Sequence, residues 1–138
     1  MSKIYKFDNF LRTNNISQIE KVNSEGQIVY KGNYSVGNTN LLALLFIDEE
    51  VVIDQICTRI ITLDIPSKRN EVLKVINEIN FKYKTIKIYL DSEDNVDLTI
   101  DYLSNKQNFS AELLFEVLIH MTKIVETNYS KFMKIMWA

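Results

Sequence analysis

The feature that most constrains the fold of this chain is an alternation of apolar and polar residues over positions 85–103, interrupted by an acidic turn at 91–95. Such alternation is typical of two antiparallel strands with one buried face and one face exposed to water. The predicted buried set is Ile86, Ile88, Leu90, Val96, Leu98 and Ile100. A slip of one residue would turn this whole set to the solvent, so the register of the hairpin is strongly specified.

A longer β-rich stretch precedes this hairpin. Gly26 marks a turn between strands expected near 16–23 and 27–36. Residues 41–47 form an unbroken apolar run, which is expected of a central strand covered on both faces. A β-branched stretch over 51–63 predicts one further strand.

Three helices complete the predicted pattern. Residues 3–14 form a short first helix, and Pro66 opens the second, since proline is tolerated in a first turn. Ser110 is a good N-cap for a long third helix, with Phe109 and Leu114 placed as a hydrophobic staple. The order α-β-β-β-β-α-β-β-α is an α+β pattern, and 138 residues fit one domain.

Composition excludes several classes of function. Sixteen basic residues against eighteen acidic ones leave no surplus of positive charge for a phosphate backbone, so we expect no nucleic-acid partner. Cys57 is the only cysteine, which rules out an intrachain disulfide and fits a reducing compartment. The N-terminus has no apolar run like a signal peptide, and the longest apolar run is far too short to span a bilayer. We therefore expect a cytoplasmic protein with no membrane partner.

No catalytic or metal-binding motif is recognisable. His120 is the only histidine, so a catalytic triad or a histidine-based metal site would have to use it. The acidic turn resembles the start of an EF-hand loop, but Val96 stands at the position where that loop requires glycine. The chain also lacks a glycine-rich phosphate loop and a C-x-x-C motif. We predict no enzymatic activity, no cofactor and no metal.

The segment 129–138 carries an unusual apolar stripe, with Lys131 and Lys134 on its opposite side. The stripe follows helical spacing and consists of Tyr129, Phe132, Met133, Met136 and Trp137. Aromatic residues and methionine are enriched at protein interfaces, so the stripe is a candidate binding surface. The alternative is that it caps the core of the domain itself, because a single domain must bury such a stripe somewhere.

A helix end, Val75-Ile76-Asn77-Glu78-Ile79-Asn80, leads into Lys87-Ile88-Tyr89-Leu90-Asp91, the acidic turn, and Val96-Asp97-Leu98. With its Asn-x-x-Asn pair ahead of a hairpin, this segment resembles the YbjN-like family, whose fold is that of type III secretion chaperones. The resemblance implies an antiparallel sheet of about five to six strands with helices packed mainly on one face. It also implies no catalysis, frequent homodimers, and action through protein binding.

Two details of this motif bear on structure. We interpret Asn77 and Asn80 as structural residues, whose amides could tie the helix end to the next strand through backbone hydrogen bonds. Asn95 stands where the family usually has the glycine of the acidic turn, and asparagine tolerates the left-handed conformation that glycine adopts there.

The first functional hypothesis is a non-enzymatic, chaperone-like or adaptor domain that binds a protein of unknown identity. We expect a symmetric homodimer whose interface includes the C-terminal stripe. A second hypothesis is a small inhibitor, such as an immunity protein or a phage-encoded antagonist. A third is an enzyme or small-molecule binder with an unrecognised site, which would show as a deep polar pocket.

Overall fold

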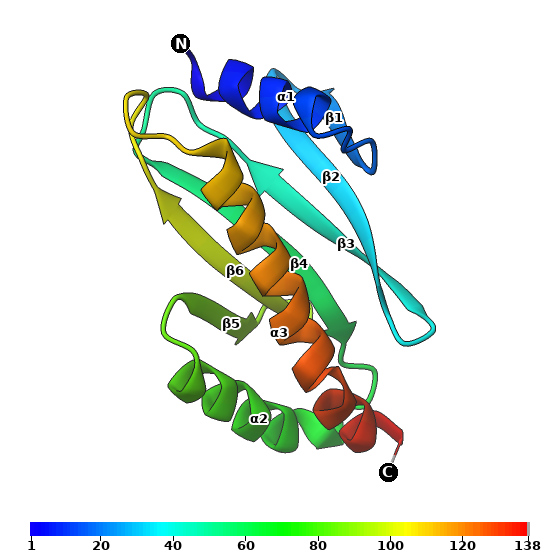
Figure 1. Ribbon diagram of the computed structural model, residues 1–138. Helices are drawn as coiled ribbons and strands as arrows, with labels where there is room; N and C mark the ends of the chain where they lie inside the picture. The colour runs from blue at the N-terminus through cyan, green and yellow to red at the C-terminus, as the bar shows by residue number, and fades with distance from the viewer. Residues whose placement is uncertain (138) are drawn as a thin grey trace.

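The computed structural model describes residues 1–137 as an α+β fold, in which the helices pack on one face of an antiparallel sheet (Figure 1). The elements are α1 (Lys3–Thr13), β1 (Ile19–Ser24), β2 (Gln27–Val36), β3 (Thr39–Phe46), β4 (Ile53–Thr62), a 3₁₀ turn (Pro66–Lys68), α2 (Arg69–Lys82), β5 (Ile86–Leu90), β6 (Asn95–Leu103) and α3 (Ala111–Trp137). The six strands lie in the order β1-β2-β3-β4-β6-β5, and each neighbouring pair is antiparallel. The predicted fold class and element order are confirmed.

The hairpin of β5 and β6 has the predicted register. Ile88 lies opposite Leu98, and both side chains are buried against the helices. Val96 and Ile100 are buried on the same face, whereas Ile86 and Leu90 are only half-buried because β5 is an edge strand. The polar positions between them point to the other face of the sheet. This hairpin is therefore the part of the fold that local alternation predicts best.

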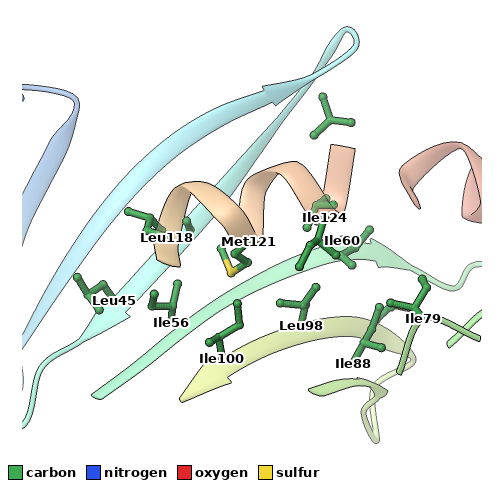
Figure 2. Close-up of a cluster of buried hydrophobic side chains, with 14 of the residues drawn as sticks. Leu45, Ile56, Ile60, Ile79, Ile88, Leu98, Ile100, Leu118, Met121 and Ile124 are labelled. Atoms are coloured by element: carbon green, nitrogen blue, oxygen red, sulfur yellow. The ribbon is translucent and has the colours of Figure 1, made fainter. Parts of the chain in front are cut away.

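The long helix α3 crosses the sheet diagonally and supplies the largest share of the helical core (Figure 1). Figure 2 shows Leu118, Met121 and Ile124 of this helix pointing into a cluster of apolar side chains from β3, β4 and β6. The predicted cap is present, because the Ser110 hydroxyl accepts a hydrogen bond from the amide of Leu113 at 3.1 Å. The capped start thus fixes where the apolar stripe of α3 enters the core.

Asn80, at the end of α2, makes two hydrogen bonds to one residue of the edge strand β5. Its side-chain amide donates to the carbonyl oxygen of Ile88 and accepts from the amide nitrogen of Ile88, both at 2.9 Å. The side chain thus occupies the position that a neighbouring strand would take, and it blocks further pairing at this edge. The predicted tie between helix and strand is present at Asn80, whereas Asn77 is exposed.

Helices cover only one face of β3, so the prediction for residues 41–47 is wrong. Ala43, Leu45 and Ile47 are buried under α3, but the alternate side chains point to the opposite face. Leu42 there keeps 41% of its surface exposed, and Leu44 and Phe46 are half-buried. An apolar run does not reveal which of its two faces the remaining chain will cover.

One smaller expectation is also corrected, and two apolar helical side chains are exposed. Tyr5 lies on the outer side of α1, two positions from the buried Phe7, and Leu73 lies at the margin of the apolar stripe of α2. The left-handed backbone of the acidic turn falls on Asp94, at φ 62°, while Asn95 is buried in β6. Asn95 instead accepts a hydrogen bond from Thr62 at 2.7 Å.

The buried face of the hairpin generates the first prediction. Leu98→Ala should lower the free energy of unfolding by about 2–5 kcal/mol, because it leaves a cavity beneath α3. Leu113→Ala is the matched control, since Leu113 lies half-exposed on the outer side of α3 and should change stability little. Urea titration of both variants measures the difference. Equal losses in the two variants would contradict the assigned register.

Candidate functional site

The structure divides the C-terminal stripe between the core and a groove. Phe132 is fully buried in the core, as the core-capping interpretation expects. The other four members of the stripe, Tyr129, Met133, Met136 and Trp137, line a groove beside the end of α3. Trp137 is 81% exposed at its mouth. Neither sequence interpretation covers the whole stripe, because the helix turns one side chain inward and the other four toward the groove.

The opposite wall of this groove comes from the sheet and from the segment after β4. It is lined by Thr39, Leu41, Ile60, Ile61, Thr62, Asp64 and Ile65, and the hollow holds about 400 Å³. We call these residues, together with the four side chains from α3, the C-terminal groove. The hydroxyl of Tyr129 reaches Thr39 at 3.5 Å, which links the helix wall to the start of β3.

The chemistry of the C-terminal groove suits apolar contact with another molecule. Methionine has three rotatable bonds and a polarizable sulfur, so Met133 and Met136 can adapt to side chains of different shape. Trp137 offers a large ring with one hydrogen-bond donor, a combination that is common at interface centres. Asp64 adds a single carboxylate to the wall. The groove can therefore hold apolar side chains of a partner, and it offers little for catalysis.

Two of the other hollows lie on the two faces of the sheet. One, of about 220 Å³, lies over Gly32 and Ala43 between α3 and the strands, and its walls are mainly apolar. The other, of about 470 Å³, lies on the sheet face opposite the helices, where Leu44, Cys57 and Arg59 contribute to its lining. Neither brings together a nucleophile, a base and an orienting group, which a hydrolytic site would require.

The residues with catalytic or metal-binding potential do not converge. His120 is exposed on α3, beside a hollow that it lines with Glu116 and Lys123. Within the part of the chain that the structure describes, no three His, Cys, Asp or Glu side chains are grouped so as to hold a metal ion. The carboxylate of Asp91 accepts hydrogen bonds from the amides of Asn95 and Glu93, and these bonds lower its pKa. That carboxylate serves the turn rather than a ligand.

Sequence reasoning missed a buried ion pair that anchors α1. The ammonium group of Lys3 lies 3.3 and 3.4 Å from the two carboxylate oxygens of Asp54, and both residues are fully buried. Lys3 also donates to the carbonyl oxygen of Val51 at 3.0 Å. The carboxylate of Glu49 accepts hydrogen bonds from the backbone N–H groups of Lys3 and Ile4, at 3.1 and 2.7 Å. These N–H groups lie in the first turn of α1, where they have no partner within the helix.

The environment of Asp54 explains why this pair is structural. Burial raises the pKa of Asp54, while the amide N–H of Asp48, at 2.9 Å, and the ammonium of Lys3 lower it and so favour the carboxylate. A sequence signal for the burial exists. Asp54 lies on the same buried face of β4 as Ile56 and Ile60, so alternation alone places its side chain inside. The partner Lys3, which lies 51 positions away, has no such signal.

No protein-family model matches the chain, and no curated protein is similar to it in sequence. Among residues 1–137, no helix has both the length and the apolar character needed to cross a membrane. The class that the coordinates define is an α+β domain with a one-sided helical layer and an apolar groove at the end of α3.

The buried ion pair generates the second prediction. Asp54→Asn keeps the shape of the side chain but leaves the ammonium of Lys3 buried without an opposite charge. The free energy of unfolding should fall by about 3–5 kcal/mol, which chemical denaturation can measure.

The control is the double variant Lys3→Met with Asp54→Asn, which removes both charges. Its stability should recover most of the loss, because the cost arises mainly from the unpaired buried charge. A double variant as unstable as Asp54→Asn alone would show that the ion pair is not the cause.

Proposed function

We propose that this chain is a non-enzymatic protein-binding domain of the chaperone-like or adaptor kind, which engages its partner through the C-terminal groove. The observation that carries the proposal is that four apolar side chains at one helix end, none of them fully buried, line an accessible hollow. Interfaces concentrate their binding energy in such aromatic and methionine side chains, set in a pocket with a polar rim.

The partner that fits the C-terminal groove is a short apolar segment of another protein. A hollow of about 400 Å³ holds a few side chains, and its walls come from a helix on one side and strand ends on the other. The segment would pack against Met133 and Met136, while the Trp137 ring covers it from solvent.

The resemblance to the YbjN-like family supports this proposal. It implies action through protein binding without catalysis, together with a homodimer as the working form. The cellular location proposed with it is the cytoplasm. The nature of the captured protein would distinguish an adaptor from an inhibitor, since an inhibitor's partner is an enzyme or toxin that loses activity on binding.

The third prediction tests the C-terminal groove directly. A photo-crosslinking residue in place of Trp137 should capture a partner protein in cells of the source, and Met133→Lys in the same chain should abolish that capture. The matched control carries the crosslinker in place of Phe81, an exposed aromatic residue at the end of α2 and outside the groove. Mass spectrometry identifies the captured chains.

Point substitutions are preferable to truncation here. Cutting the chain after Asn128 would remove Phe132 from the core and unfold the protein, so a loss of binding would say nothing about the groove. Thermal melts of the substituted chains should match the parent. Equal capture from positions 137 and 81, or capture unaffected by Met133→Lys, would contradict binding at the groove.

A further inference from the structure

The face of the sheet opposite the helices is left uncovered by the fold, and it carries charged side chains, among them Lys31, Arg59 and Asp97, as well as apolar ones. None of the helices between residues 1 and 137 lies over it (Figure 1). We call it the open face, and alternation and pairing place these apolar or weakly polar residues on it: Val22, Val29, Leu42, Leu44, Phe46, Ile53, Cys57, Tyr89 and Leu103. Ile53 and Leu103 pair across two strands, and both are exposed. Uncovered apolar patches of this extent mark interaction sites.

The strand β3 supplies the apolar centre of this face. Its unbroken apolar run is the pattern of a strand buried on both sides, yet the fold buries only one. Leu42, Leu44 and Phe46 form a row along the middle of the open face. Beside them Val29 is already buried by its neighbours on the same face, so part of a second apolar layer exists in the single chain.

We propose that the cover is a second copy of this chain, packed open face to open face about a two-fold axis. This inference rests on the homodimer of the proposed function and gives that dimer an interface. Six strands at the usual spacing, each about eight residues long, present about 750 Å² per copy. Two such faces bury about 1,500 Å², the standard size of a stable interface. Sheets packed in this way lie about 10 Å apart.

Part of the charge on the open face suits such a dimer. One cross-strand row runs through all six strands as Glu20, Lys31, Leu44, Cys57, Thr99 and Lys87. A two-fold axis can run parallel to the strands, between β3 and β4. This axis reverses the order of the row in the second copy, so the first residue of the row in one copy lies over the last residue in the other. Glu20 then faces Lys87 of the second copy, so opposite charges meet at both ends of the row.

The remaining positions of the same row are also compatible. Leu44 faces Cys57 of the second copy at the axis, where apolar contact is needed. Lys31 faces Thr99 of the second copy, which has Asp97 and Asp101 two positions away on either side along β6. The row in one copy is therefore complementary to the reversed row in the other copy. A symmetric interface requires this self-complementarity.

This arrangement leaves the C-terminal groove accessible. The groove lies on the helical side of the sheet, where Tyr129 and Met133 of α3 form one wall. The open face lies on the other side, so a dimer can form and still present two partner-binding grooves on its outer surfaces. The sequence alone assigned self-association to the C-terminal stripe; the open face is an alternative interface that the strand pairing brings into view.

The fourth prediction uses light scattering and the single cysteine. Wild-type protein at tens of micromolar should have twice the chain mass. Leu44→Glu buries a carboxylate at the apolar centre of the row and should raise the dimer dissociation constant about a hundredfold or more. Met136→Lys, in the C-terminal groove, should leave the mass of the dimer unchanged.

A second measurement uses unmodified protein, so it does not depend on the folding of Leu44→Glu. A maleimide should modify Cys57 slowly at concentrations where the dimer forms, because the thiol lies near the axis and the second copy covers it. Wild-type protein diluted below its dissociation constant should react faster.

Each contrary outcome has a separate meaning. A dimer whose Cys57 reacts as fast as in the diluted protein, and which dissociates on Met136→Lys, would overturn the open-face interface while leaving the homodimer standing. A monomeric wild type would overturn both the interface and the homodimer. Capture of a partner at the C-terminal groove tests the proposed function apart from either result.

Discussion

The rest of the structure depends on one packing constraint, the burial of a single apolar stripe of α3 against the same side of successive strands. Met121 sits at the centre of that contact, fully buried among side chains from the sheet (Figure 2). Each strand must turn its apolar phase toward α3, since alternation allows only two faces. The same constraint creates the open face, because the one long helix that the chain possesses can cover only one side.

Both candidate surfaces follow from this asymmetry. The end of α3 extends beyond the strands that cover its middle, so its last turns hold Phe132 in the core but leave Met136 and Trp137 beside a groove. The buried pair of Lys3 and Asp54 closes the opposite end of the helical layer, where α1 meets the turn between β3 and β4. The two candidate surfaces thus lie at the margins of the helical core, and the buried charges of Lys3 and Asp54 hold α1 to the sheet.

Much of the fold could be predicted because its signals are local. Alternation in residues 85–103 set the hairpin register, and Ser110 marked the start of α3 through a cap that spans only three residues. The tie of Asn80 to β5 followed from a local motif, since the bonded residues Asn80 and Ile88 are eight positions apart. The misses are nonlocal: the ion pair joins Lys3 to a residue 51 positions away, and an apolar run cannot say which face is covered. The candidate stripe was found, but its division at Phe132 depends on where the sheet ends.

The central claim is that the open face is an interface between two copies, and a distance across the dimer tests it most directly. A spin label at an introduced Thr85→Cys, in a Cys57→Ser background, sits at the β5 edge of each sheet and outside the apolar rows. Pulsed electron resonance should give an intermolecular distance of roughly 25 Å, which follows from five strand spacings and two sheets about 10 Å apart. The absence of any dipolar coupling at concentrations where scattering detects a dimer would contradict the claim.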